Sequence, residues 1–119
     1  MLEILEDDPQ VLIWWGTPVE IASALARLER EKLLTANQVT DALTTAHRLT
    51  ESWQEIVPSD VVRRTAERLL RVHPLRAADG LQLAAALTAA DHDPANLDIV
   101  CLDSRLISAA EREGFTVLQ

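Results

Sequence analysis

The sequence predicts an α/β fold in which a mostly parallel sheet carries helices on both of its faces. Residues 11–15 form a short, continuous apolar run, which has the character of a strand that is buried on both faces, and residues 97–102 have the character of another buried strand. Helical patterns separate these runs, and such alternation is typical of a parallel sheet covered on both sides. No shift in composition marks a boundary, so we expect a single domain over residues 1–119.

Residues typical of helix starts and helix ends predict the secondary-structure elements in the first half of the chain. Residues 1–7 resemble the end of a helix that Pro9 stops. Thr17 is expected to cap a helix, because Pro18 then takes the first helical position, where its missing N–H costs nothing. Three further elements are expected before residue 60: the end of that helix near Leu33, a second helix over residues 36–53 and an edge strand at residues 56–58.

In the second half of the chain the sequence predicts three helices and two strands. Ser59 is expected to cap a helix through Val72, and His73-Pro74 breaks the chain after it. The remaining elements are a more apolar helix over residues 75–90, the buried strand at 97–102, a helix over 104–113 and a last strand over 115–118.

Composition limits the classes of function that the chain can have. A formal net charge of −8 argues against binding nucleic acid by bulk electrostatics, but it leaves room for a nuclease that contacts phosphate through bound cations. The single cysteine, Cys101, cannot form an internal disulfide and is expected in the core, which predicts a reducing, cytoplasmic environment. We find no leader-like segment at Met1 and no apolar run of membrane-spanning length.

Three acidic residues occupy unusual positions. Glu20 and Asp103 each follow a predicted buried strand at the start of a helix, where ligands bind in open α/β sheets. Asp79 lies one turn into the helix over residues 75–90, on the same stripe as Leu83 and Leu87. A carboxylate on an apolar stripe is costly unless it is paired or bound to a cation. Convergence of the three acids would favour Mg²⁺ or Mn²⁺ and metal-assisted phosphodiester hydrolysis.

Each acid also has a structural interpretation. Thr17-x-x-Glu20 has the form of a capping box, and Asp103 has the position of an N-cap. Asp79 can pair with Arg76 or face solvent. Capping does not exclude metal binding, because a carboxylate has two oxygens.

Basic and aromatic residues add two weaker hypotheses. Arg76 and Arg105 lie beside the acids and are candidates for contact with substrate phosphate. The tryptophans can stack on nucleobases, although core or dimer packing is the more common use of such residues: Trp14, Trp15 and Trp53. The three histidines have no ligand spacing and are expected to be structural or solvent-facing: His47, His73 and His92.

Taken together, three segments resemble the conserved acidic motifs of PIN-domain proteins of the VapC type. Residues 17–25 (TPVEIASAL) are similar to the second motif, residues 75–87 (LRAADGLQLAAAL) to the third, and residues 100–106 (VCLDSRL) to the fourth. Their order and spacing match over essentially the whole chain, and the middle motif is the most specific.

The resemblance implies a metal-dependent endoribonuclease of a toxin–antitoxin pair, with a PIN-like three-layer α/β/α fold. It assigns Glu20, Asp79 and Asp103 to the Mg²⁺ or Mn²⁺ site, RNA as the substrate, and a cognate antitoxin and a homodimer partner. Family members begin with a central strand that ends in an acidic residue, and residues 1–7 correspond to the helix after it. We therefore expect this first strand and its acid to be missing, about 20 residues in all, and the activity to be impaired. The alternative is a non-catalytic PIN-like remnant that binds an antitoxin or forms a dimer.

Overall fold

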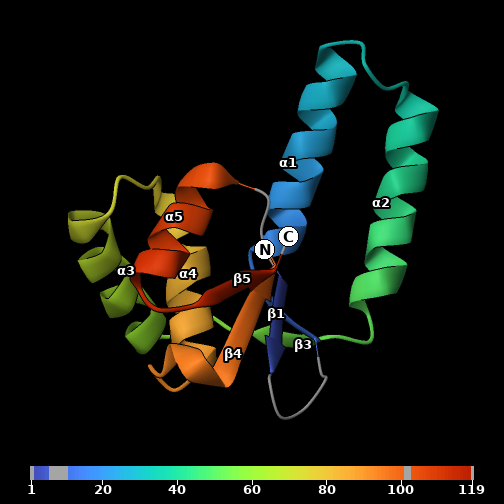
Figure 1. Cartoon of the computed structure of the whole chain (residues 1–119). Coiled ribbons are helices and arrows are strands. Elements are labelled where there is room, and N and C mark those ends of the chain that lie inside the picture. The colour runs from blue at the N-terminus through green and yellow to red at the C-terminus, as the bar shows by residue number, and fades with distance from the viewer. Residues whose placement is uncertain (1, 6–10, 101–102, 119) are drawn as a thin grey trace. The chain divides into compact units, whose positions relative to one another are not determined.

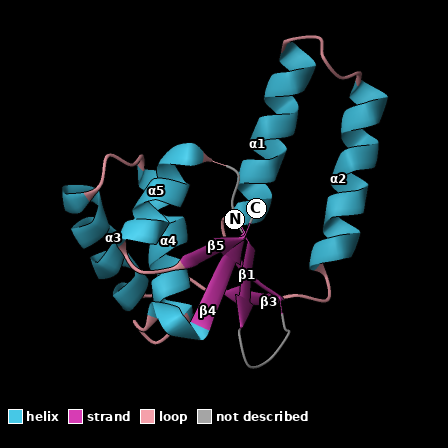
Figure 2. Ribbon diagram, viewed as in Figure 1, coloured by secondary structure: helices cyan, strands magenta, loops and turns pink. Residues whose placement is uncertain are grey.

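The computed structural model describes residues 2–5, 11–100 and 103–118, with the backbone alone for 2–5. The chain forms two compact units, the first from Met1–Trp15 and Gln54–Gln119 and the second from Gly16–Trp53 (Figures 1 and 2). The elements of the first unit are β1 (Leu2–Leu5), β2 (Val11–Trp14), β3 (Gln54–Ile56), α3 (Asp60–Val72), α4 (Ala77–Ala89), the short 3₁₀ helix η1 (Pro94–Asn96), β4 (Leu97–Val100), α5 (Ser104–Arg112) and β5 (Thr116–Leu118). The second unit holds α1 (Thr17–Arg30) and α2 (Ala36–Thr50).

The first unit contains a five-stranded mixed sheet in the order β3-β2-β1-β4-β5. The pairs β2–β3 and β4–β5 are parallel, whereas β1 is antiparallel to both β2 and β4. Because β1 opposes both neighbours, the other four strands run in one direction and the central strand alone runs against them. The predicted α/β class is confirmed, and the parallel character of the sheet is interrupted only at its centre.

The prediction of a helix end at residues 1–7 was wrong for residues 2–5, which form the central strand β1. Leu2 pairs with Ile13 on one side and with Val100 on the other. A strand in this position finds backbone partners at both edges, whereas without it β2 and β4 would each leave a row of donors and acceptors unpaired. This long-range pairing decides the conformation of a four-residue segment whose local pattern fits either structure.

The two strands that the sequence predicts to be buried, β2 and β4, differ in how far their two faces are covered. In β2 three successive residues, Leu12, Ile13 and Trp14, are buried, so both faces of this strand are covered. In β4, Leu97 and Ile99 are fully buried while the residues between and after them are only half-buried. The predicted buried strand is therefore confirmed at Leu97 and Ile99, which lie on its buried face. Cys101 and its predicted core position lie outside the described residues.

The helical core of the first unit forms around α4. Six consecutive residues of this helix, Gln82 to Leu87, are buried, so α4 is enclosed on all sides rather than amphipathic. It packs against α3, where Leu69 is fully buried, and it also contacts β2, β4 and α5. The helices α3 and α4 approach closely at Gly80, where a Cβ atom would lie 2.9 Å from Leu70 Cδ2.

Side-chain caps fix two of the predicted helix starts in the first unit. The Ser59 hydroxyl accepts a hydrogen bond from the Val62 N–H at 3.2 Å, which confirms the predicted start of α3. The Asp103 carboxylate accepts one from the Leu106 N–H at 3.0 Å and caps α5. Both bonds satisfy an N–H that has no partner within its own helix.

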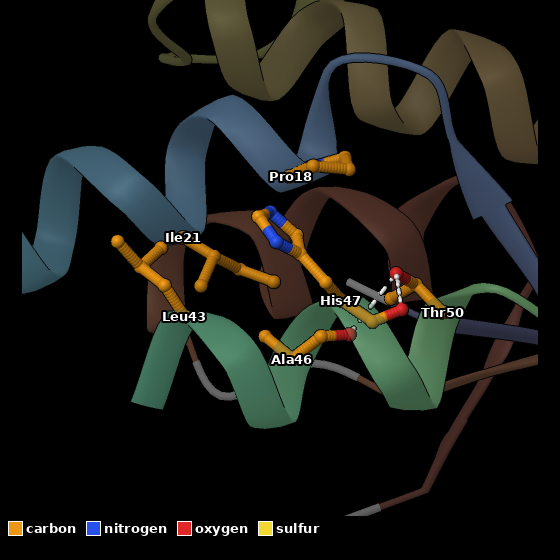
Figure 3. A pocket seen from close by; sticks show the side chains of 6 residues that line it. All are labelled: Pro18, Ile21, Leu43, Ala46, His47 and Thr50. Atoms are coloured by element: carbon orange, nitrogen blue, oxygen red, sulfur yellow. Dashed lines mark hydrogen bonds between the residues drawn. The ribbon is translucent and has the colours of Figure 1, made fainter. Parts of the chain in front are cut away.

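The second unit is a hairpin of two antiparallel helices. Pro18 and Ile21 of α1 face Leu43, Ala46 and His47 of α2 across a shallow hollow (Figure 3). The helices end earlier than predicted, α1 at Arg30 and α2 at Thr50. His47 is exposed at this hollow, as expected for a solvent-facing histidine.

The predicted capping box at Thr17 and Glu20 was wrong, and a different one caps α2. The N-cap of α1 is Gly16, without a side-chain hydrogen bond, and Thr17 is already helical. At α2 the Thr35 hydroxyl accepts from the Gln38 N–H at 3.2 Å and Gln38 Oε1 accepts from the Thr35 N–H at 2.8 Å. The sequence carries this signal as Thr35-x-x-Gln38.

Within the described residues, no helix combines the length and the apolar character needed to cross a lipid bilayer.

Candidate functional site

The carboxyl ends of the parallel strands define one edge of the sheet in the first unit. Since β2 and β4 run in the same direction, their last residues, Trp14 and Val100, lie at this edge. We call it the carboxyl edge. Ligands of open α/β sheets bind outside such an edge.

Asp103 lies just beyond the carboxyl edge, after β4 and at the start of α5. Its side chain is exposed, and its Oδ1 accepts the capping hydrogen bond from Leu106. The structural interpretation of Asp103 as an N-cap is confirmed. Because a carboxylate has two oxygens, a capping role does not in general exclude a role as a cation ligand.

Asp79 lies in the first turn of α4, and α4 begins at the carboxyl edge. Leu81, two residues further on, lines a hollow together with Trp14 and Trp15, which end and follow β2. At its other end α4 leads through η1 to the start of β4, at the opposite edge of the sheet. The N-terminal turn of α4 therefore lies beside the end of β2.

The carboxylate of Asp79 is half-buried and has no partner among the described residues. It forms no ion pair with Arg76, which is exposed. The pairing of these two residues, one of the structural interpretations, is therefore not found. The residues predicted on the stripe of Asp79 are buried, but burial does not set them apart, because the residues between them are buried as well: Leu83, Ala86 and Leu87.

The start of α5 lies beside the connection between α3 and α4. His73 and Pro74 of this connection line a second hollow together with Ser104 and Arg105 of α5. Asp79, in the first turn of α4, and Asp103, the N-cap of α5, thus belong to two helices of the first unit that contact each other.

No protein family, no curated protein and no solved structure matches this chain. The description of the site therefore depends on the residues themselves.

Glu20, the third predicted acid, belongs to the second unit. It is half-buried in the first turn of α1, which begins two residues after Trp15 in the sequence. Its grouping with Asp79 and Asp103 stays a prediction. Within residues 2–5, 11–100 and 103–118, no three side chains of His, Cys, Asp or Glu are arranged to hold a metal ion.

A charged cluster at the far end of α5 was missed by the sequence analysis. Glu113, the C-cap of α5, accepts hydrogen bonds from Arg68 Nη2 at 3.0 Å and lies 2.7 Å from His73 Nε2. Burial raises the pKa of Glu113, but hydrogen bonds and positive charge from Arg68 and His73 outweigh it and lower the pKa overall. These partners are separated by 40 residues or more in the sequence, so no local pattern could have identified the cluster.

Proposed function

We propose that this protein is a metal-dependent endoribonuclease of the toxin–antitoxin type that hydrolyses phosphodiester bonds in RNA. One observation supports this proposal above the others. Asp79 is a half-buried carboxylate without a partner among the described residues, on the most apolar helix, at the edge where Asp103 follows a parallel strand. A PIN-like three-layer arrangement of the chain is part of the same proposal.

The chemistry of these carboxylates fits a hard cation. A carboxylate that is partly buried without a partner loses hydration, and a bound cation would replace the lost interaction. Mg²⁺ and Mn²⁺ take carboxylate oxygens as ligands. In this proposal Asp79 and Asp103 of the first unit hold the cation, and the assignment of Glu20 as a metal ligand rests on the resemblance to PIN-domain proteins alone.

The bound cation would supply an activated water and neutralise charge on the scissile phosphate. The residues of the chain would hold and orient the metal ligands. The hydrogen bond from the Leu106 N–H fixes the Asp103 side chain, and the buried helix α4 fixes the position of Asp79. Arg76 and Arg105 are exposed and would meet the phosphates of the substrate.

The direction of the central strand favours weak activity. In a fully parallel sheet the central strand would end at the carboxyl edge and could place an acid there. Here β1 presents its amino end instead, since Leu2 lies opposite Val100, the last residue of β4. With one carboxylate fewer, we expect weaker cation binding and slower cleavage.

The same observation favours the second candidate function, a non-catalytic remnant that binds an antitoxin or a second copy of the chain. In either case the proposed partners are a cognate antitoxin and a homodimer mate. We propose a cytoplasmic location, because the only cysteine cannot form an internal disulfide.

The decisive experiment measures Mn²⁺-dependent cleavage of a mixed RNA substrate, together with Mn²⁺ affinity by calorimetry. Three proteins are compared: the chain itself, Asp79→Asn and the control Glu111→Gln, which removes an exposed acid from α5. The nuclease proposal predicts that Asp79→Asn loses at least about tenfold in both affinity and cleavage rate, the size seen when groups at a metal site are changed, while the control behaves like the parent.

Two results would decide against the nuclease. Equal Mn²⁺ affinity in the parent and Asp79→Asn, with folding verified by circular dichroism, contradicts the metal site. Absence of cleavage by the parent despite Mn²⁺ binding at Asp79 favours the non-catalytic module.

A further inference from the structure

We infer that the hollow between the α3–α4 connection and α5 is an anion site that holds a phosphate group of the RNA substrate. Its polar lining consists of His73, Ser104, Arg105, Ser108 and Arg112, and its volume is about 210 Å³. A water occupies about 30 Å³, so the hollow has room for a phosphate group and several waters. This inference rests on the proposed function, because it places the substrate beside Asp103.

The charge of the hollow is of one sign. Arg105 and Arg112 are seven residues apart and therefore lie on one face of α5. Both are exposed, and neither has a carboxylate partner within the part of the chain that the structure describes. Among the residues that the structure describes, no acidic side chain lines the hollow, although Glu113 contacts the lining residue His73 and Asp103 precedes Ser104. Paired guanidinium groups bind phosphate oxygens with directed hydrogen bonds.

The start of α5 adds neutral donors to this face. Ser104 is the first residue of the helix, and Ser108 lies one turn further along the same face. The backbone N–H groups of the first helical turn have no partner within the helix and are oriented towards bound anions. Asp103 caps the Leu106 N–H and opposes an anion, so the two arginines have to supply the net attraction.

His73 provides an independent indication of a ligand. It is 5% exposed and lines the hollow, and its Nε2 is held 2.7 Å from Glu113 Oε2. Its Nδ1 is buried and has no hydrogen-bond partner among the described residues. Buried polar atoms nearly always have a partner. The Nδ1 atom is therefore an unsatisfied polar group of a residue in the wall of the hollow.

The position of the hollow beside Asp103 indicates that the phosphate it holds belongs to the RNA substrate. Asp103 precedes Ser104 directly, so an RNA strand with its scissile bond at the carboxyl edge would place a neighbouring phosphate over the start of α5. The hollow then fixes the register of the strand without taking part in bond cleavage.

The test measures binding without cleavage. A short single-stranded RNA and inorganic phosphate are titrated separately into the ¹⁵N-labelled protein in the presence of EDTA. The affinity for RNA is also measured as a function of salt. The variants are Arg105→Ala/Arg112→Ala and Ser108→Glu, which adds a negative charge at an exposed helical position. The matched control is Arg63→Ala/Arg64→Ala, two exposed arginines of α3.

Phosphate and RNA are both expected to shift the amide signals of residues 104–108, and phosphate is expected to compete with RNA. The double variant should weaken RNA binding at least about tenfold and reduce the slope of log affinity against log salt by about 1.4, which is about 0.7 for each of the two positive charges removed from a single-stranded ligand. Ser108→Glu should weaken it similarly, and the control should bind nearly like the parent.

Three outcomes would overturn the inference. They are an unchanged salt slope in the double variant, a response to inorganic phosphate without any RNA binding, and a response to an acidic peptide in place of RNA. Because cations are absent, RNA binding at the hollow can hold even when cleavage fails, and the two proposals are tested separately.

Discussion

The cluster of Glu113, Arg68 and His73 gives a sharp stability prediction for Glu113→Gln. The substitution keeps the shape of the side chain and removes its charge. The bond to His73 is buried, with side-chain exposures of 3% and 14%, and charged hydrogen bonds of this kind contribute about 2 kcal/mol. The contact with Arg68, which is 52% exposed, adds less than about 1 kcal/mol. Since glutamine retains one neutral hydrogen bond of about 1 kcal/mol, we expect a net loss of between about 1 and 2 kcal/mol.

This loss is measurable in two ways. Urea unfolding at neutral pH gives the difference in the free energy of unfolding directly. For 119 residues, an unfolding entropy of about 2.1 cal/mol/K per residue converts a loss of about 1 to 2 kcal/mol into a Tm decrease of about 4 to 8 °C. The control Asp60→Asn removes a carboxylate from an ion pair with side-chain exposures of 71% and 74%, and it should cost about 0.5 kcal/mol.

The pH dependence distinguishes the charge of Glu113 from its packing. The pKa of Glu113 is lowered in the folded state, so its stabilising contribution is fully present above the ordinary value of 4.5 and is lost as the pH falls through the folded-state pKa. The stability difference between the parent and Glu113→Gln should therefore shrink between neutral pH and about pH 3. A difference below about 0.5 kcal/mol at neutral pH, or one that does not change on acidification, would refute the reasoning.

Two further substitutions test the two units separately. Leu69→Ala empties a fully buried position between α3 and α4 and should cost about 3 kcal/mol in urea unfolding; a cost below about 1 kcal/mol would show that the helix pair is loosely packed. Thr35→Ala removes one half of the capping box of α2 and should cost about 1 kcal/mol. The loss should be seen as faster amide exchange in the first turn of α2, and unchanged exchange there would contradict the capping geometry.

Local signals in the sequence were sufficient for most elements of the fold. Ser59 and Asp103 predicted helix starts correctly, because an N-cap is satisfied within three residues of chain. The continuous apolar run of β2 predicted burial on both faces, and the structure confirms it. The prediction that Thr17 caps α1 was wrong. Proline is accepted at the first or the second helical position, and the helix starts one residue earlier than the pattern favours.

The candidate site could be predicted only in part. Asp79 and Asp103 stand out because a carboxylate is unusual on an apolar stripe or directly after a buried strand, and they belong to two helices of the first unit that contact each other. The lining of the anion hollow was not found, apart from Arg105, because it joins the α3–α4 connection to α5 over a long stretch of sequence. His73 was expected to be structural, and its contact with Glu113 supports that role beside the one inferred at the hollow.

The central strand connects the fold to the proposed activity. A reversed strand satisfies the backbone groups of β2 and β4 as well as a parallel one would, because hydrogen bonding needs only a neighbour at each edge. The proposed metal site at the carboxyl edge, in contrast, depends on the direction of β1, because this direction decides whether the amino end or the carboxyl end of the strand lies at that edge. A sheet can therefore be completed by β1 while the site at its edge lacks a ligand. On this argument the fold should be stable without metal, and adding Mn²⁺ should raise the Tm only slightly, by the mass action of a weak ligand. A large increase in Tm at micromolar Mn²⁺ would show that a strong cation site forms without an acid from the central strand.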